Sequence, residues 1–284
     1  MTLKTYRIGG LRLRLEADEP IDDADFFPLF RTDDSAAPDV TVTVLRRPLP
    51  QPEGDELTRT DRRRSVRAGG TLYEYTCFPD PVRRQPVPYA CAVRQGAEMT
   101  LYVDHSAPLW DTMLFNAIGL PDLLLERAAV IVHAAFIGAG EDGILFAGPP
   151  DQGKTTQALL WQTHRNAVVI NGDRAVLRET PRGVTAYGIP FAGSSRLCRN
   201  EERPVRAIVF PEKDADNTVT ALAPFEGFKR LIGCFSYTQT DPAAQDRALR
   251  MAERIATECR CWRLRCRPDA EAVAALAEAL ERNT

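Results

Sequence analysis

The sequence is poor in features that mark several classes of protein. Its 36 Lys and Arg are nearly balanced by 39 Asp and Glu, so the net charge of −3 gives no field that would attract nucleic acid or an anionic membrane. The longest apolar stretch, residues 128–140, is too short to span a bilayer and contains His133. The N-terminal residues lack the pattern of a secretory signal. These absences predict a cytoplasmic protein without a nucleic-acid or membrane partner.

Cysteine is present, but in a number and arrangement that do not suggest a disulfide framework. The seven cysteines are scattered through a chain that is long enough to bury a core without disulfides, so reduced thiols are expected. Three cysteines lie close enough in sequence to suggest a metal site: Cys259, Cys261 and Cys266. Structural zinc sites, however, use CxxC-like cysteine pairs or supporting histidines, and this segment has neither. Apolar and basic side chains alternate over residues 262–266, which favours a strand with one buried face.

The first hundred residues alternate apolar and polar side chains with a period of two. Such runs occur at residues 11–15, 40–44, 72–78, 89–93 and 99–103. This period is typical of strands with one buried face, so we predict a small β-rich unit of antiparallel strands over residues 1–106. The polar, proline-containing stretch at residues 46–70 is predicted to be its longest loop or a hairpin.

From Pro108 the period changes, and the rest of the chain alternates predicted strands with predicted helices. A helix is expected at residues 109–118, where apolar side chains recur on one helical face. Strands are then predicted at 130–137, 143–147, 167–170, 175–177, 184–187 and 205–210, and helices at 154–162, 225–234 and 243–259. A last strand precedes a helix capped by Asp269. The sequence therefore predicts a mixed α/β (α+β) domain over residues 107–284.

Residues 148–155 fit the phosphate-binding pattern G-x-x-x-x-G-K-[ST], between a predicted strand and a predicted helix. Polyphosphate oxygens must be met by several backbone N–H groups and a helix N-terminus, and glycine lets the backbone approach closely because it lacks Cβ. The predicted nucleotide-binding residues are Gly148, Pro149, Pro150, Asp151, Gln152, Gly153, Lys154, Thr155 and Thr156.

Lys154 and Thr155 have separate expected tasks in this loop. The pattern places the Lys154 ammonium on the β and γ phosphates, and it makes the Thr155 hydroxyl a ligand of the Mg²⁺ that bridges them. ATP and Mg²⁺ are therefore the predicted cofactors. Asp173 closes the apolar run at residues 168–171 and is predicted to hold the metal shell, although Asn-Gly-Asp is also typical of a turn. His133 lies in the strand before the loop, where it is either catalytic or a satisfied core residue.

The order of these residues resembles the C-terminal domain of the HPr kinase/phosphorylase family, which has the phosphoenolpyruvate-carboxykinase type of P-loop. That family has a strand bearing a histidine, a hairpin into the P-loop, a helix, and a strand ending in two aspartates. Here His133, the loop at 148–156 and residues 171–173 occur in that order. The likeness covers residues 128–195 and more weakly the C-terminus. In particular, the chain resembles stand-alone bacterial HPr-kinase-like proteins, some of which accompany peptide-modification genes.

The resemblance implies catalytic roles for His133, Lys154 and Asp173, and metal ligation by Thr155 and Asp173. In the family, the histidine supports an aspartate that accepts the proton of the attacking serine hydroxyl, and the next aspartate binds metal. The metal position falls on Asp173 here, whereas the base position falls on Gly172. Asp151 stands where the family loop usually has glycine, and Asp adopts left-handed backbone angles more readily than most residues.

Three hypotheses about function follow from the sequence. The first is an ATP-dependent kinase that transfers the γ-phosphoryl group to the hydroxyl of a protein, a peptide or a small molecule. The second, favoured by Gly172, is a nucleotide-sensing partner that modulates other enzymes, such as those of a peptide-modification system, without transferring phosphate. The third is a small-molecule kinase, against which the histidine-bearing strand argues. The sequence leaves the oligomeric state open, a homo-oligomer included.

Overall fold

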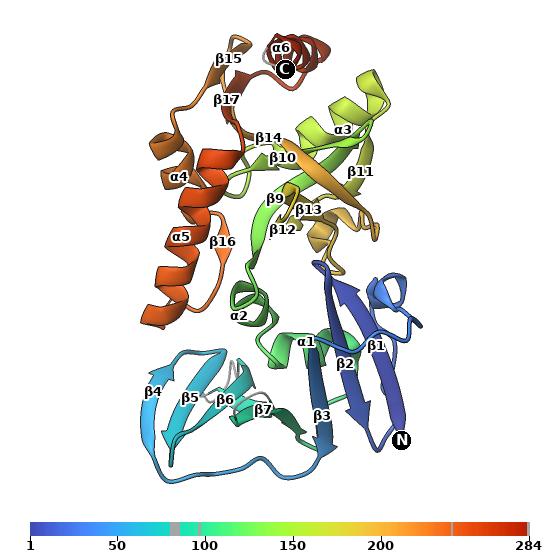
Figure 1. Ribbon diagram of the computed structural model, residues 1–284, viewed down its shortest axis with the longest axis vertical. Coiled ribbons are helices and arrows are strands. Elements are labelled where there is room, and N and C mark those ends of the chain that lie inside the picture. The colour runs from blue at the N-terminus through green and yellow to red at the C-terminus, as the bar shows by residue number, and fades with distance from the viewer. Residues whose placement is uncertain (80–85, 96–97, 240, 283–284) are drawn as a thin grey trace. The chain divides into compact units, whose positions relative to one another are not determined.

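The computed structural model describes residues 1–79, 86–95, 98–239 and 241–282, and it is drawn in Figure 1. The fold is mixed α/β with two sheets, which confirms the predicted class. Two compact units are formed by Met1–Arg7 with Leu11–Leu123, and by Ile8–Gly10 with Leu124–Thr284. The division falls later than the predicted boundary near residue 107.

The first unit contains an eight-stranded sheet with the order β1-β2-β3-β8-β7-β6-β5-β4. Its strands are β1 Thr2–Ile8, β2 Leu11–Ala17, β3 Val40–Arg46, β4 Asp55–Arg59, β5 Arg63–Ala68, β6 Thr71–Phe78, β7 Val87–Gln95 and β8 Glu98–Val103. Every run that the two-residue period predicted lies in one of them, and residues 46–70 contain the hairpin β4–β5. The helix α1 (Asp111–Ala117) packs against β6 and β7, which explains why it belongs to this unit. The helix α2 (Leu120–Leu125) follows.

The prediction of antiparallel strands is wrong for two pairs in this sheet. β2 pairs with β3 in parallel, and β3 pairs with β8 in parallel. The connection from β2 to β3 is long and contains the 3-10 helix η1 (Phe27–Phe30). It can therefore carry the chain back to the end of the sheet at which β2 begins, which a parallel pair requires. Alternating side chains indicate which face of a strand is buried, but they say nothing about the direction of its neighbour.

The second unit contains a nine-stranded mixed sheet. Its strands are β9 Ala129–Ala139, β10 Asp142–Ala147, β11 Val168–Asn171, β12 Arg174–Thr180, β13 Gly183–Tyr187, β14 Glu202–Lys213, β15 Thr218–Ala221, β16 Phe235–Ser236 and β17 Cys261–Cys266. Its helices are α3 Lys154–Arg165, α4 Pro224–Ile232, α5 Pro242–Glu258 and α6 Ala270–Glu281. β9 pairs with β10 and β16 along one edge and with β11 and β12 along the other, so it is the central strand of the region that holds the predicted site.

Helices cover this sheet on two faces, and Figure 1 shows α5 and α3 on different sides of β9. Val132 and Ala134 of β9 belong to the same buried cluster as side chains of α5. Ala135 and Ile137 belong to a second cluster with side chains of α3 and α6. Since successive side chains of a strand point to opposite faces, His133 projects toward the face that α3 covers.

The C-terminal predictions are confirmed. The carboxylate of Asp269 accepts a hydrogen bond from the Ala272 N–H at 2.9 Å and caps α6, in which Val273, Leu276 and Leu280 are buried. In β17, Trp262, Leu264 and Cys266 are buried, as the alternation indicated.

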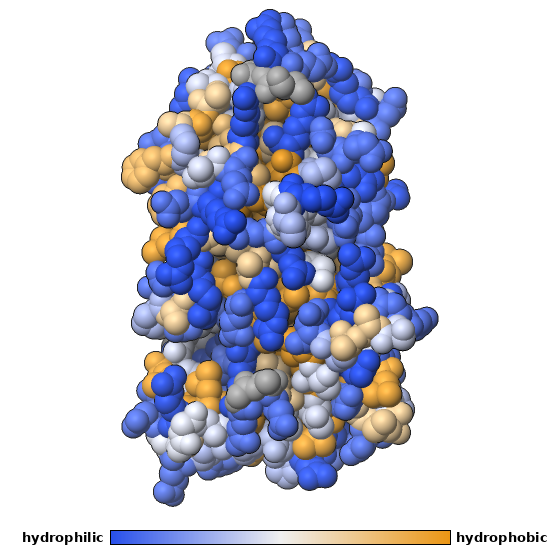
Figure 2. Space-filling model, viewed as in Figure 1, coloured by the Kyte–Doolittle hydropathy of each residue, from blue (hydrophilic) through white to orange (hydrophobic). Residues whose placement is uncertain are grey.

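All seven cysteines of the chain are free thiols. Burial raises the pKa of the Cys261 thiol to about 12, so this group stays protonated at neutral pH. Across the described ranges, no helix is long and apolar enough to cross a membrane. On the face of the molecule seen in Figure 2, hydrophilic side chains predominate and apolar ones are scattered among them.

Candidate functional site

Residues 148–153 form a loop that β10 enters and α3 leaves, as the sequence predicted. Three residues of the loop have positive φ: Gly148 at 147°, Asp151 at 63° and Gly153 at 84°. Glycine adopts such angles without the strain that a Cβ causes, and Asp is one of the few other residues that tolerate the left-handed region. The local sequence therefore suits the tight path of the loop.

The two glycines of the loop have free space on the side where a side chain would stand, and α3 begins directly after the second of them. A Cβ built on Gly153 would meet nothing within 4 Å, and one built on Gly148 would first meet the Gln152 Cβ at 3.9 Å. The first intrahelical bond runs from the Gln157 N–H to the Gly153 carbonyl at 2.9 Å, so the N–H groups of the preceding turn have no acceptor within the helix. Free N–H groups at a positive helix end are suited to binding an anion.

Lys154 is the first residue of α3, and its ammonium turns back over the loop. Its Nζ donates a hydrogen bond to the Pro149 carbonyl at 2.6 Å. The pKa of Lys154 is lowered, chiefly by burial, while the nearby groups of Cys234, Asp173 and Asp151 act to raise it. The cation is thus held among acceptors at a helix N-terminus, where a phosphate could replace the carbonyl as its partner.

The pairing of strands brings His133 and Asp173 to the end of β10. Ala134 is paired with Ala147, the last residue of β10, and His133 is paired with Arg174, the first residue of β12. The N–H of Ala134 donates to the carbonyl of Asp173 at 3.0 Å. β9 thus holds the start of the loop on one side and the Asp173 turn on the other.

The electrostatics of His133 show that the three predicted catalytic residues are neighbours. Burial lowers the pKa of His133 most, and the charges of Arg174 and Lys154 lower it further, whereas Asp173 raises it. The imidazole is therefore more neutral at a given pH than an exposed histidine and can accept a proton. The structure brings His133, Lys154 and Asp173 into one site.

Thr155 and Asp173 meet at the turn between β11 and β12. The Thr155 hydroxyl donates to the Gly172 carbonyl at 2.9 Å, and the Asp173 carboxylate pairs with Arg174 at 3.2 Å. The described residues contain no group of three or more His, Cys, Asp or Glu that could hold a metal ion. If these two oxygens bound a Mg²⁺, they would supply only part of its six ligands. This fits an ion that normally keeps several waters and also binds phosphate oxygens. Thr156 is exposed on the outer side of α3.

Asn171 organises this turn, a role that the sequence did not reveal. The side chain is fully buried. Its Nδ2 donates to the carbonyls of Ile189 at 2.9 Å and Phe191 at 3.2 Å, and its Oδ1 accepts from the N–H groups of Asp173 at 2.9 Å and Arg174 at 3.0 Å. One amide thus fixes both the Asp173 turn and the segment after β13. The only signal in the sequence is an amide in turn chemistry.

Ser195 is the second residue that sequence reasoning missed. It ends the short 3-10 helix η2 (Gly193–Ser195) and packs on Gly172, where a built Cβ would lie 2.7 Å from the Ser195 Cβ and closer still to its Oγ. Gly193 is equally close to the turn, since its built Cβ would lie 2.8 Å from Oδ2 of Asp173. The place of a side chain at position 172 is therefore taken by Ser195.

We predict that Gly172→Ala destabilises the protein by about 1–3 kcal/mol, because the new methyl group overlaps Ser195 although the backbone angles permit alanine. Urea unfolding measures the loss. The double variant Gly172→Ala/Ser195→Gly makes room for the methyl group and is expected to recover a large part of it. A Gly172→Ala variant as stable as the parent would contradict the packing described here.

Cys234 lies beneath the loop, and no motif in the sequence points to it. Its carbonyl accepts a hydrogen bond from the His133 N–H at 2.8 Å. Its buried thiol accepts a hydrogen bond from the N–H of Gly148, and burial raises the pKa of that thiol. Cys234 is therefore a neutral group that holds the first residue of the loop.

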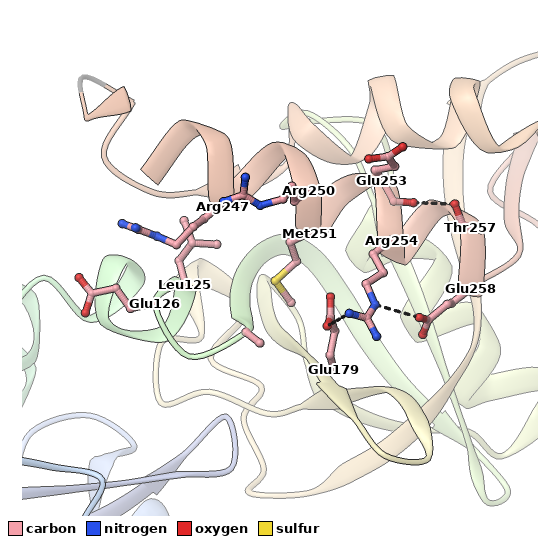
Figure 3. A pocket seen from close by; sticks show the side chains of 11 residues that line it. Leu125, Glu126, Glu179, Arg247, Arg250, Met251, Glu253, Arg254, Thr257 and Glu258 are labelled. Carbon is pink, nitrogen blue, oxygen red and sulfur yellow. Dashed lines mark hydrogen bonds and ion pairs between the residues drawn. The ribbon is translucent and has the colours of Figure 1, made fainter. Parts of the chain in front are cut away.

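A separate cavity of about 640 Å³ lies along α5 (Figure 3). In it Met251 projects between charged side chains, and Arg254 bridges Glu179 at 2.9 Å and Glu258 at 3.1 Å. Arg174 begins β12, whereas Glu179 lies near the end of that strand. The helix α5, which lines the cavity, packs on one face of the sheet, and α3 packs on the opposite face. The cavity is thus distinct from the loop, and none of the predicted site residues lines it.

Comparisons with known proteins add little to this geometry. No family model and no curated protein sequence matches the chain. Among solved structures, it is distantly similar to the HPr(Ser) kinase/phosphatase from Coxiella burnetii, with 12% identity and a TM-score of 0.29, over 54% of this chain and 94% of that chain. A likeness at this TM-score carries no argument about the fold or the function of the chain.

Proposed function

We propose that this protein binds Mg-ATP at residues 148–156 and transfers the γ-phosphoryl group to a hydroxyl. The observation that carries the proposal is the loop itself: two glycines at positive φ whose Cβ positions are free of close neighbours, and N–H groups at the start of α3 that have no acceptor within the helix. This arrangement supports binding of a polyphosphate, since backbone donors and the helix end both favour negative charge.

The side chains around the loop support a transfer reaction. Lys154 would exchange the Pro149 carbonyl for phosphate oxygens, placing its charge where charge is spread in the transition state. Thr155 and Asp173 would hold Mg²⁺, which supplies further neutralisation of phosphate charge. His133, whose pKa is lowered, could take up the acceptor proton. The acceptor would be a hydroxyl of a protein, a peptide or a small molecule.

In a second candidate function, this protein senses a nucleotide and regulates other enzymes without transferring a phosphoryl group. It is favoured by the packing at Gly172, because Ser195 occupies the space in which a second carboxylate beside Asp173 would lie. A neutral hydroxyl is a poor proton acceptor, although phosphoryl transfer with a loose transition state demands little of a base. Release of labelled phosphate or transfer of label from γ-labelled ATP separates the two functions.

We predict that Asp173→Asn weakens the Mg²⁺-dependent part of nucleotide binding by about tenfold, since a neutral amide holds the metal shell less well than a carboxylate. Isothermal titration with ATP, with and without Mg²⁺, measures this part directly. Asp216→Asn, at an exposed position, is the matched control and should titrate as the parent does. If Mg²⁺ strengthens binding equally in the parent and Asp173→Asn, then Asp173 serves the turn and not the metal.

A further inference from the structure

The segment between β13 and β14, residues 188–201, is fixed against the Asp173 turn on both sides of Ser195. Before Ser195, the carbonyls of Ile189 and Phe191 accept hydrogen bonds from the buried Asn171 amide. After it, the Leu197 carbonyl accepts from the Gly172 N–H at 3.3 Å, and the Arg199 N–H donates to the Ile170 carbonyl at 2.8 Å. The position of the serine is therefore set by the same turn that carries Asp173.

The Ser195 hydroxyl packs on Gly172, whose carbonyl accepts the hydrogen bond from Thr155 and which directly precedes Asp173. The place that a Cβ on Gly172 would occupy is 2.7 Å from the Ser195 Cβ, and it is 3.7 Å from the Thr155 Cγ2. On the same turn, the Asp173 carboxylate packs against Gly193, two residues before the serine. A nucleotide whose Mg²⁺ is held by Thr155 and Asp173 would present its terminal phosphate next to this hydroxyl.

The hydroxyl is anchored but retains the capacity to react. Its Oγ donates to the Ala192 carbonyl at 2.8 Å and accepts only a long hydrogen bond of 3.4 Å from the Leu197 N–H. A serine oxygen has two lone pairs, so one remains for attack on phosphorus. The side chain is half-buried, which limits competition from water, whereas the neighbouring Ser194 is exposed.

We propose that Ser195 is a phosphoryl acceptor within the same chain, so that the protein phosphorylates itself at this residue. The proposal rests on the proposed Mg-ATP site and names one acceptor for it. The Ser195 Oγ forms a bond to the γ-phosphorus as the bond from that phosphorus to the β,γ-bridging oxygen breaks. The hydroxyl proton is released to water, since a loose transition state demands little of a base, and the products are phosphoserine and Mg-ADP.

Two properties follow from the position of the acceptor. Because the hydroxyl packs on the turn that carries Asp173, one of the proposed metal ligands of the same chain, transfer is intramolecular and its rate does not depend on protein concentration. The phosphoserine carries about −1.5 to −2 charges at neutral pH and would lie beside the Asp173 carboxylate, so like-charge repulsion weakens nucleotide binding after transfer. Incorporation should therefore stop at one phosphoryl group per chain.

The test uses the full chain with Mg²⁺ and γ-labelled ATP. Incorporation is followed over a tenfold dilution series, and mass spectrometry of peptides locates the label. Ser195→Ala should lose the label, and Ser194→Ala, the matched control on the adjacent exposed serine, should keep it. Labelling of a tagged Lys154→Ala chain by the untagged parent tests for transfer between molecules. Thermal unfolding with and without Mg-ATP reports nucleotide binding separately.

Label on Ser195 at an unchanged first-order rate across the dilutions supports the proposal. Label at another residue, or label passed to the Lys154→Ala chain, overturns it. An unlabelled chain that Mg-ATP still stabilises against heat also overturns it, while leaving nucleotide binding intact. A chain that is neither labelled nor stabilised removes the proposed nucleotide site together with this inference.

Discussion

Lys154→Ala is expected to abolish the stabilisation that Mg-ATP gives the parent protein. A ligand that binds only the native state at a hundred times its Kd raises the free energy of unfolding by about 2.7 kcal/mol. The Lys154 ammonium is the positive charge that would bind the phosphates. In the unliganded protein it donates a hydrogen bond to the Pro149 carbonyl of the same loop. The substitution should therefore remove nucleotide binding with little change in the unliganded protein.

Thermal-shift titration of the parent and the variant with Mg-ATP makes the measurement. Lys213→Ala is the matched control, because Lys213 is an exposed lysine at the end of β14. The control should show the parent's shift at every nucleotide concentration. Equal shifts in Lys154→Ala and the parent would mean that residues 148–156 do not bind the phosphates.

Asn171→Asp is expected to destabilise the protein by about 3 kcal/mol, the largest effect on stability that we predict. The substitution keeps the shape of the side chain but replaces the Nδ2 donor by an oxygen that faces the carbonyls of Ile189 and Phe191. It leaves a carboxyl group at a position with no solvent exposure, where either protonation or an unpaired charge costs free energy.

Urea denaturation, read as the midpoint at unchanged m-value, measures this loss. Asn166→Asp is the matched control. Asn166 is the exposed C-cap of α3 with φ of 53°, an angle that Asp also tolerates, and a charge at that helix end costs at most about 1 kcal/mol. Similar midpoints for the two variants would show that the hydrogen bonds of the Asn171 amide contribute little to stability.

Local patterns in the sequence were sufficient to predict most elements of the second unit. Residues 143–147 and 154–162 were predicted correctly because an apolar run and an unbroken helical stretch flank a loop with glycines at fixed spacing. The left-handed backbone at Asp151 also follows from residue type. Strand direction in the first unit did not follow, because the parallel pairing of β2 with β3 depends on the path of a long connection.

The parts of the candidate site that sequence reasoning missed are contributed by distant segments. Ser195 reaches the Asp173 turn only after the chain has formed β12 and β13, and Cys234 reaches the loop only after β14 and α4. Neither residue lies in a motif of fixed spacing. Turn chemistry at residues 171–173 was recognised, but the partners of the Asn171 amide are carbonyl groups, which every residue possesses. Side-chain patterns cannot identify such partners.

The central strand β9 holds the site through peptide groups. The main chain of His133 donates to the Cys234 carbonyl, and that of Ala134 donates to the Asp173 carbonyl. Any amino acid other than proline can make these two bonds. Substitution of the imidazole thus leaves these two main-chain bonds available, although it removes the partly buried ring and its interactions with the neighbouring charges. A frame of this kind fixes where the backbone lies without fixing which side chain stands at position 133.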